Sequence, residues 1–170
     1  MRGKGRPLQV RFAPGLEARR GRLLEGAAGG TAVHAGGFPR RREIVLDAEL
    51  LRQPGELARI LVHEIFHFVW PRLDNATRRS WERLLVEELR RGARGELGWS
   101  AESRKRPLAA ADRARRTRRW REYACESFCD TAAWLAAGGR AHEEFTLAAS
   151  FRRARRDWFR RFLARPAISI

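Results

Sequence analysis

Residues 60–70 read ILVHEIFHFVW, an apolar run that carries two histidines four positions apart. The apolar residues recur with helical spacing, which predicts a largely buried helix. On a helix, residues four apart differ by roughly 40° around the axis and by about 6 Å along it. The imidazoles of His63 and His67 can therefore reach one ion, and the stretch predicts a zinc site.

Glu64 completes the pattern His-Glu-x-x-His at residues 63–67. Its carboxylate projects from nearly the same side of the helix without stacking on either histidine. It is therefore predicted to be the general base that deprotonates a zinc-bound water. A purely structural role is less favoured, because the neighbours of Glu64 are apolar and a buried carboxylate needs a partner.

The length and composition predict one soluble domain spanning residues 1–170. The first twelve residues are basic and broken by Gly and Pro, so no secretory signal is expected, and no apolar run is long enough to span a membrane. Cys125 and Cys129 lie four apart in a helical pattern, where their Cβ atoms are about 5–6 Å apart, beyond the usual disulfide spacing. Free thiols indicate the reducing cytoplasm, and without a long apolar run no membrane partner is expected.

The formal net charge is +16, and every basic residue except Lys4 and Lys105 is arginine. Such a charge can indicate a nucleic-acid or anionic-membrane partner. The chain is also rich in Ala and Gly, as a GC-rich coding bias would produce, and apolar residues interrupt the arginine clusters at 40–42, 113–121 and 152–161 at helical spacing. We interpret the clusters as solvated helix faces, so nucleic acid stays open as a partner but is not favoured.

Short strands are predicted in the first third of the chain, where apolar and polar residues alternate between Gly and Pro turns. They lie at residues 8–12, 31–34 and 43–47. A helix is predicted between the first two, at 16–25, with Gly26 ending it. Three strands so close together indicate a small antiparallel sheet.

Beyond residue 53 the apolar pattern is helical, with Pro54 in the first turn of the first helix and Asn75 as the N-cap of the second. Helices are predicted at 54–69, 75–91, 108–137 and 141–164, with a loop at 95–99. The predicted fold class is therefore α+β, a small N-terminal antiparallel sheet (strands within 8–47) followed by a mainly helical domain (helices within 54–164).

Two motifs, HEIFH at 63–67 and ESFCD at 126–130, resemble those of the gluzincin superfamily of zinc metallopeptidases. The short chain looks most like the reduced minigluzincin type, which has a small sheet, an active-site helix and a glutamate helix. The motifs cover ten residues. The order of elements extends the similarity to roughly two-thirds of the chain.

The resemblance implies a zincin-like fold in which Zn²⁺ is held by His63, His67 and Glu126, with Glu64 as the catalytic base. It also implies that Asp130 accepts a hydrogen bond from a ligand imidazole. Physical chemistry agrees with both roles: a carboxylate ligand keeps the ion an effective Lewis acid, and an acceptor behind a histidine fixes the tautomer that binds metal.

Other third ligands stay open. Glu122 lies one turn before Glu126 on the same helix face, although only Glu126 is followed four residues later by Asp. Cys125 or Cys129 could bind the ion as a thiolate instead, which would depart from the gluzincin pattern.

Histidine-based patterns fit less well. The metzincin pattern requires Gly and His where this chain has Trp70 and Leu73, so that class is excluded. A downstream histidine ligand, as in SprT-like proteins, would have to be His142, far along the chain. His142 and Tyr123 are also candidates for stabilising the oxyanion of peptide hydrolysis.

The strand at 43–46 precedes the active-site helix, and in this fold such an edge strand binds an extended peptide by adding a strand. Its apolar side chains fit a core position equally well. Both interpretations stay open.

Two functions are compatible with these residues. The first is a zinc metallopeptidase that acts on a peptide or protein: zinc-bound water, deprotonated by Glu64, attacks the carbonyl carbon, and Glu64 passes the proton to the leaving amine. The alternative is a degenerate peptidase-like binding protein with structural zinc and a basic surface that docks nucleic acid or a protein partner. An intact Glu64 favours the enzyme, because a structural site does not need it.

Overall fold

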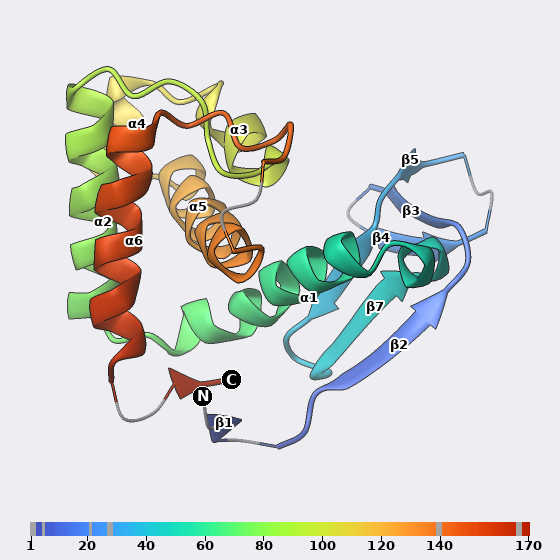
Figure 1. Ribbon diagram of the computed structural model, residues 1–170. Coiled ribbons are helices and arrows are strands. Elements are labelled where there is room, and N and C mark those ends of the chain that lie inside the picture. Colours follow the sequence, from blue (N-terminus) through green and yellow to red (C-terminus); the bar gives the residue numbers. More distant parts are fainter. Residues whose placement is uncertain (1–2, 5, 21, 27–28, 139–140, 166–167) are drawn as a thin grey trace.

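The computed structural model describes residues 3–4, 6–20, 22–26, 29–138, 141–165 and 168–170, without the side chains of residues 3, 4 and 169. Two small sheets come first in the chain, and helices follow (Figure 1). The predicted α+β class is confirmed. Strands β1 (Gly3–Lys4) and β8 (Ile168–Ser169) pair in parallel and bring the two chain ends together.

The first sheet has the strand order β2–β7–β6. Its strands are β2 (Gln9–Ala13), β6 (Ala35–Phe38) and β7 (Glu43–Asp47). β6 runs antiparallel to β7, but β2 runs parallel to it, so this sheet is mixed rather than purely antiparallel. The parallel pair requires a long connection, and the second sheet occupies that connection.

The second sheet is antiparallel, with the order β4–β3–β5. Its strands are β3 (Leu16–Arg19), β4 (Arg22–Glu25) and β5 (Thr31–Ala32). The helix predicted at 16–25 is therefore wrong. Arg20 adopts a positive φ of 49° that reverses the chain, and Leu16 and Leu23 pack against Val45 of the first sheet.

Among the described residues, the helical part contains two 3₁₀ and six α segments. They are η1 (Ala48–Arg52), α1 (Pro54–Val69), η2 (Trp70–Arg72), α2 (Asn75–Arg90), α3 (Trp99–Lys105), α4 (Ala110–Arg115), α5 (Arg118–Ala136) and α6 (Ala149–Leu163). The helix predicted at 54–69 is confirmed. The second helix starts as predicted, except that Asp74 is its cap: the Asp74 carboxylate accepts the Thr77 N–H at 2.6 Å.

Two helix predictions fail at backbone irregularities. The helix predicted at 108–137 divides into α4 and α5, because Arg116 has a left-handed conformation and Thr117 then caps α5. The last helix starts at Ala149 instead of Ala141. Phe145 and Leu147 are buried in the core, and the backbone N–H groups of Thr146 and Leu147 donate to the Glu96 carbonyl oxygen, which holds this segment outside a helix. Gly139, two residues beyond the end of the helix predicted at 108–137, lies outside the described residues.

Helix α1 lies between the first sheet and the helical part (Figure 1). One face of the sheet packs Ile44 and Leu46 against Ile60 and Phe68 of α1. The other side of α1 packs against α5, whose apolar face continues into an aromatic core shared with α2 and α6. α1 is therefore held on both sides, which fixes the position of its histidines.

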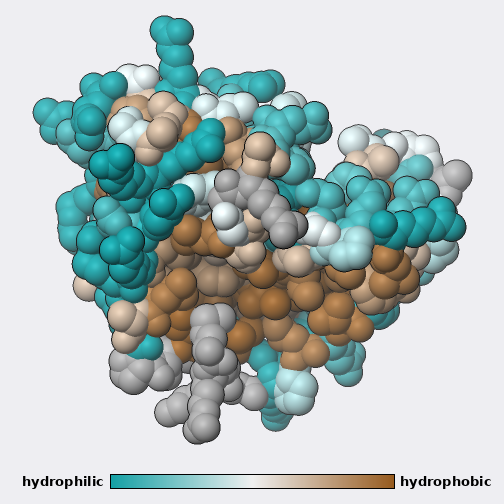
Figure 2. Space-filling model, in the orientation of Figure 1, coloured by the Kyte–Doolittle hydropathy of each residue, from teal (hydrophilic) through white to brown (hydrophobic). Residues whose placement is uncertain are grey.

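Hydrophilic and apolar side chains gather in different areas of the face shown in Figure 2. Apolar side chains gather over α1 and the first sheet, and hydrophilic side chains cover the helical part. Val10 and Phe12 of β2 contribute exposed apolar surface, at 44% and 40% exposed. Within the described residues, no helix combines the length and apolar character needed to cross a lipid bilayer.

Candidate metal centre

Three side chains from α1 and α5 converge on one point. His63 Nε2 lies 3.0 Å from His67 Nε2, and Glu126 Oε2 lies 3.4 Å and 3.5 Å from these two atoms. Tetrahedral ligands at about 2.1 Å from a zinc ion are separated by about 3.4 Å, so this ligand triangle matches the spacing that zinc requires. The side chains are 12–22% exposed, which leaves the triangle open on one side.

Asp130 holds the outer nitrogen of His63. Its Oδ1 lies 2.7 Å from His63 Nδ1, and its Oδ2 accepts the backbone N–H of Ala101 at 2.8 Å. With Nδ1 donating to Asp130, the lone pair of Nε2 is directed into the ligand triangle. The N-terminal turn of α3 therefore fixes the carboxylate that orients the histidine.

Gly98 makes this arrangement possible. A Cβ at Gly98 would lie 2.2–2.5 Å from three atoms of the Asp130 carboxylate. Any side chain at this position would collide with a group already held by His63 and Ala101. The approach of residue 98 to α5 therefore requires glycine.

His67 has a different outer partner. The Sγ atom of Cys125 lies 3.6 Å from His67 Nδ1, so a thiol occupies the place that Asp130 takes behind His63. His67, Cys125 and Cys129 form a second group whose ligand atoms all lie within 4.8 Å of one another. Both cysteines are free. Each of the two donor groups could hold a metal ion, and His67 belongs to both.

The charges of the ligand triangle favour a cation. Burial opposes protonation of His63, but its hydrogen bonds to Asp130 and Glu126 outweigh burial and raise its pKa to about 10. Burial likewise opposes protonation of His67, whose contacts with Cys125 and Glu126 raise its pKa. The two histidines hold the pKa of Glu126 far below its usual value, against the effect of burial. Without a metal the cluster retains protons, and a dication would compete with them.

Glu64 lies at the adjoining cleft. A cavity of about 470 Å³ is lined by residues of β5, β6, α1 and α3, and both His63 and Glu64 contribute to its wall. The Glu64 carboxylate occupies the space in front of Gly37 in β6, where a Cβ would lie 2.7 Å from Oε2. Ligand triangle, carboxylate and cleft therefore adjoin one another.

Glu122 lies away from the ligand triangle. Its carboxylate pairs with Arg118 at 2.7 Å and with Arg104 at 3.3 Å, on a more exposed part of α5. The structure therefore brings Glu126, and not Glu122, to the two histidines.

Tyr123 is fully buried and its hydroxyl donates to Glu96 at 2.6 Å. It belongs to a network of buried charges, the Arg155 network, in which Arg155 pairs with Glu88 and with Glu96, each at 2.7 Å, and Lys105 pairs with Glu96 at 3.1 Å. Tyr123 therefore cannot contact a substrate as an oxyanion stabiliser. The interpretation of the arginines at 152–161 as a solvated helix face is therefore wrong at Arg155, which is buried.

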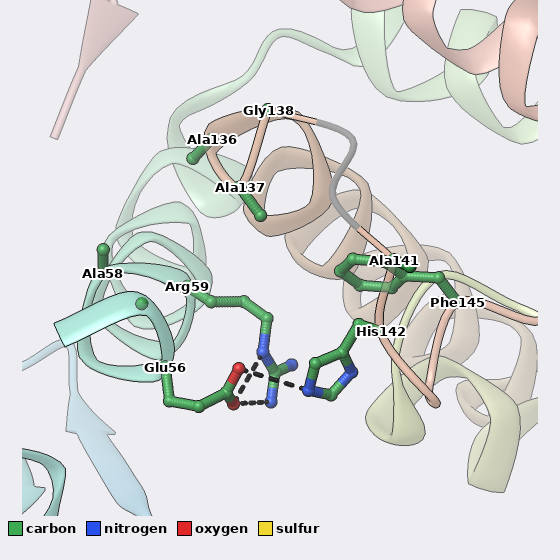
Figure 3. Close-up of a pocket in the computed structure, with 10 residues that line it drawn as sticks. Glu56, Ala58, Arg59, Ala136, Ala137, Gly138, Ala141, His142 and Phe145 are labelled. Carbon is green, nitrogen blue, oxygen red and sulfur yellow. Dashed lines mark hydrogen bonds and ion pairs between the residues drawn. The ribbon is translucent and has the colours of Figure 1, made fainter. Parts of the chain in front are cut away.

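His142 contacts the first turn of α1 and lines a separate cavity of about 370 Å³ (Figure 3). Its Nε2 is 3.2 Å from Glu56, which also binds Arg59, and its ring contacts Phe145. The structure does not bring His142 to the two histidines of α1, so His142 is not the third ligand.

The strand at 43–46 is not an edge strand. β7 is central, and Ile44, Val45 and Leu46 are completely buried. Within the described residues, β6 is the edge of this sheet on the side of Glu64, because no strand pairs with its outer edge. A peptide that extends this sheet beside Glu64 would therefore have to pair with β6.

Several contributors to the site were missed at the level of sequence. Gly37, Gly98 and Ala101 act through the absence of a side chain or through a backbone N–H, and such roles leave no chemical signature in the sequence. Cys125 was considered only as a direct ligand, although its position one residue before Glu126 on a helix indicates proximity to the site.

Comparison of the chain with protein-family models, with curated proteins and with solved structures found no match.

Proposed function

We propose that this protein is a zinc-dependent peptidase of the gluzincin type. The observation that carries the proposal is the ligand triangle of His63, His67 and Glu126, with its 3.0–3.5 Å spacing. The contacts of Asp130 with His63 and of Cys125 with His67 add support. So does Glu64, because a site that only stabilised the fold would not need a carboxylate at the neighbouring cleft. The two motifs shared with gluzincins point to the same class.

Each residue has a distinct role in the proposal. His63, His67 and Glu126 hold the ion, which supplies a Lewis acid that polarises the peptide carbonyl. Asp130 keeps the Nδ1 proton of His63 in place, so that Nε2 remains a ligand. Glu64 accepts a proton from the attacking water at a carboxylate oxygen and returns it to the nitrogen of the leaving amine.

The substrate in this proposal is a peptide in extended conformation. β6 offers its outer backbone edge beside Glu64, and a strand added there would lie along the cleft. Gly36 faces Leu23 on one side of the sheet, and Gly37 faces Glu64 on the other. Because Gly37 has no side chain, the backbone of β6 approaches the base closely. Main-chain pairing of this kind binds many sequences, and it favours unfolded or flexible segments over folded ones.

The free cysteines support a reducing compartment, and we propose the cytoplasm as the place of action. Exposed arginines on α6, such as Arg153 and Arg156, keep a nucleic-acid partner open without favouring it, because the arginine that lines the cleft at the site, Arg59, is already paired with glutamates. A binding protein with structural zinc would retain its function without Glu64.

Replacing the base tests the proposal. Glu64→Gln removes the proton acceptor and leaves the ligands in place, so zinc content should persist while hydrolysis of a fluorogenic peptide mixture falls by at least about 100-fold. Glu122→Gln is the matched control on α5 and should change neither quantity, because Glu122 pairs only with surface arginines. Full activity in the Glu64→Gln protein would remove the proposed base.

A further inference from the structure

The two nitrogens of His67 face different chemistry. Nε2 faces His63 and Glu126, while Nδ1 faces the thiol of Cys125 at 3.6 Å. Cys129 follows one turn later on α5, and its ligand atom lies within 4.8 Å of those of His67 and Cys125. The proposed peptidase mechanism uses neither thiol as a ligand. This arrangement, called the thiol cluster below, consists of His67, Cys125 and Cys129.

We propose that the thiol cluster is a second metal site, selective for a soft ion such as copper(I), and that its occupation weakens zinc binding by the ligand triangle. Thiolates bind zinc as well as soft ions, but two thiolates among three ligands suit copper(I), whereas the imidazole and carboxylate ligands of the triangle suit zinc. The thiol protons pass to solvent when the ion binds.

The geometry of the cluster fits such an ion. Sulfur and nitrogen bound at about 2.3 Å and 2.0 Å to one ion in a trigonal plane are separated by roughly 3.7 Å. The observed distance from Cys125 Sγ to His67 Nδ1 is 3.6 Å. The thiol cluster can therefore close around an ion with little movement of the contact it already has.

The surroundings add to the case. Cys129 is completely buried among apolar side chains, while Cys125 and His67 are partly exposed. An ion can enter from the open side of His67 and end beside a sulfur that water does not reach. Such shielding favours a soft, weakly hydrated ion over a hard one.

The coupling between the two sites follows from the chemistry of imidazole. A neutral imidazole has one lone pair and one N–H, so it can bind one ion unless it loses the second proton. Zinc needs the lone pair on Nε2, and the soft ion needs it on Nδ1. The coupling part of the proposal rests on the proposed zinc site, but the thiol cluster itself does not.

Anaerobic titration with copper(I) buffered by a competing chelator tests the site. The metal-free protein should bind one copper(I) per chain and develop a thiolate-to-metal charge-transfer band in the ultraviolet. Cys125→Ser should weaken binding by more than about 100-fold, a larger loss than removal of an outer partner causes. A Cys125→Ser protein that binds copper(I) as tightly as the wild type would overturn the proposal.

Two further variants separate this proposal from the proposed function. Glu126→Gln removes a ligand of the triangle only, so copper(I) binding should persist even though zinc is lost; loss of both would show that the thiols are not an independent site. Zinc release from loaded protein, followed with a chromogenic chelator, should accelerate with copper(I) in the wild type and not in Cys129→Ala. Unchanged release in the wild type would contradict the coupling, and urea unfolding of each variant verifies that it is folded.

Discussion

Helix α5 contributes to two polar clusters, one closed and one open. The Arg155 network is closed: the Arg155 guanidinium is 0% exposed, and hydrogen bonds from it reach Glu88, Glu96 and Thr131. The ligand triangle is open: His63, His67 and Glu126 direct three atoms at one another across 3.0–3.5 Å, and all are partly exposed.

The difference shows which buried charges serve the fold and which serve a ligand. In the Arg155 network each charge already has an opposite partner, so an added ion would gain nothing. In the ligand triangle two imidazoles with raised pKa values surround one carboxylate, and the arrangement is balanced only by bound protons or by a cation. Shifted pKa values occur in both clusters and therefore do not distinguish them. The two clusters differ because only the ligand triangle directs several lone pairs at one point.

The largest effect is expected from opening the closed cluster. Arg155→Met should reduce the free energy of unfolding by about 3–5 kcal/mol, because buried Glu88 would lose its counter-charge and buried Glu96 would keep only Lys105. Arg153→Met, on the exposed side of the same helix, should change it by less than about 0.5 kcal/mol. Urea unfolding measures both. Equal stabilities of the two variants would show that the Arg155 network contributes little.

The next effect concerns protons at the open cluster. The pKa of His63 is raised to about 10, so its contribution to the stability of the metal-free protein is complete below pH 6.5 and is lost as the pH rises through 10. Zinc must displace these protons, and its affinity should therefore rise about tenfold to a hundredfold from pH 7 to pH 8, for one or two protons released. Calorimetry in buffers of different ionisation enthalpy counts them. An affinity independent of pH would contradict the arrangement.

Removing the outer carboxylate should have an effect of similar size. Asp130→Asn removes the charge and replaces one of the two acceptor oxygens by an NH2 donor, so either His63 Nδ1–H or the backbone N–H of Ala101 loses its acceptor. Zinc affinity should fall by about 10–100-fold, the usual cost of losing an outer partner. Competition with a chromogenic chelator gives the value. Asp112→Asn is the control, because the Asp112 carboxylate accepts hydrogen bonds from Ala109 and Thr117, neither of which belongs to the site.

The smallest effect is expected at Gly37. In Gly37→Ala the new methyl group would displace the end of the flexible Glu64 side chain, which lies 2.7 Å from the Cβ position. Peptidase activity should fall by roughly tenfold because the base is misplaced, while zinc content and stability stay nearly unchanged. Gly55→Ala places a methyl group in open space on α1 and should leave activity intact. Unchanged activity in Gly37→Ala would remove β6 from the proposed mechanism.

The same contrast explains what could be predicted from sequence. Local periodicity was sufficient for α1, α2, β2 and β7, and the spacing within 63–67 and 126–130 was sufficient to select the residues that converge. The hairpin of β3 and β4 was missed because its pattern also fits a helix, and only the contact of Leu16 and Leu23 with Val45 decides between them.

Partners distant in sequence were harder still. Nothing local to Arg155 indicates that it would be buried rather than solvated like Arg153 and Arg156, since the three lie in one arginine-rich helix. Its burial depends on Glu96, in a loop whose path is set by tertiary hydrogen bonds to Thr146 and Leu147. Likewise, α3 became important only because the backbone N–H of Ala101 reaches Asp130.

X-ray absorption spectroscopy of the zinc-loaded protein tests most directly whether the ligand triangle is the zinc site. Zinc–nitrogen and zinc–oxygen distances of about 2.0–2.2 Å are distinguishable from zinc–sulfur at about 2.3 Å. Ligation by His63, His67 and Glu126 predicts a first shell with two imidazoles and no sulfur, unchanged in Cys125→Ser. A sulfur shell that disappears in Cys125→Ser would place the zinc on the thiol cluster and contradict the proposed centre.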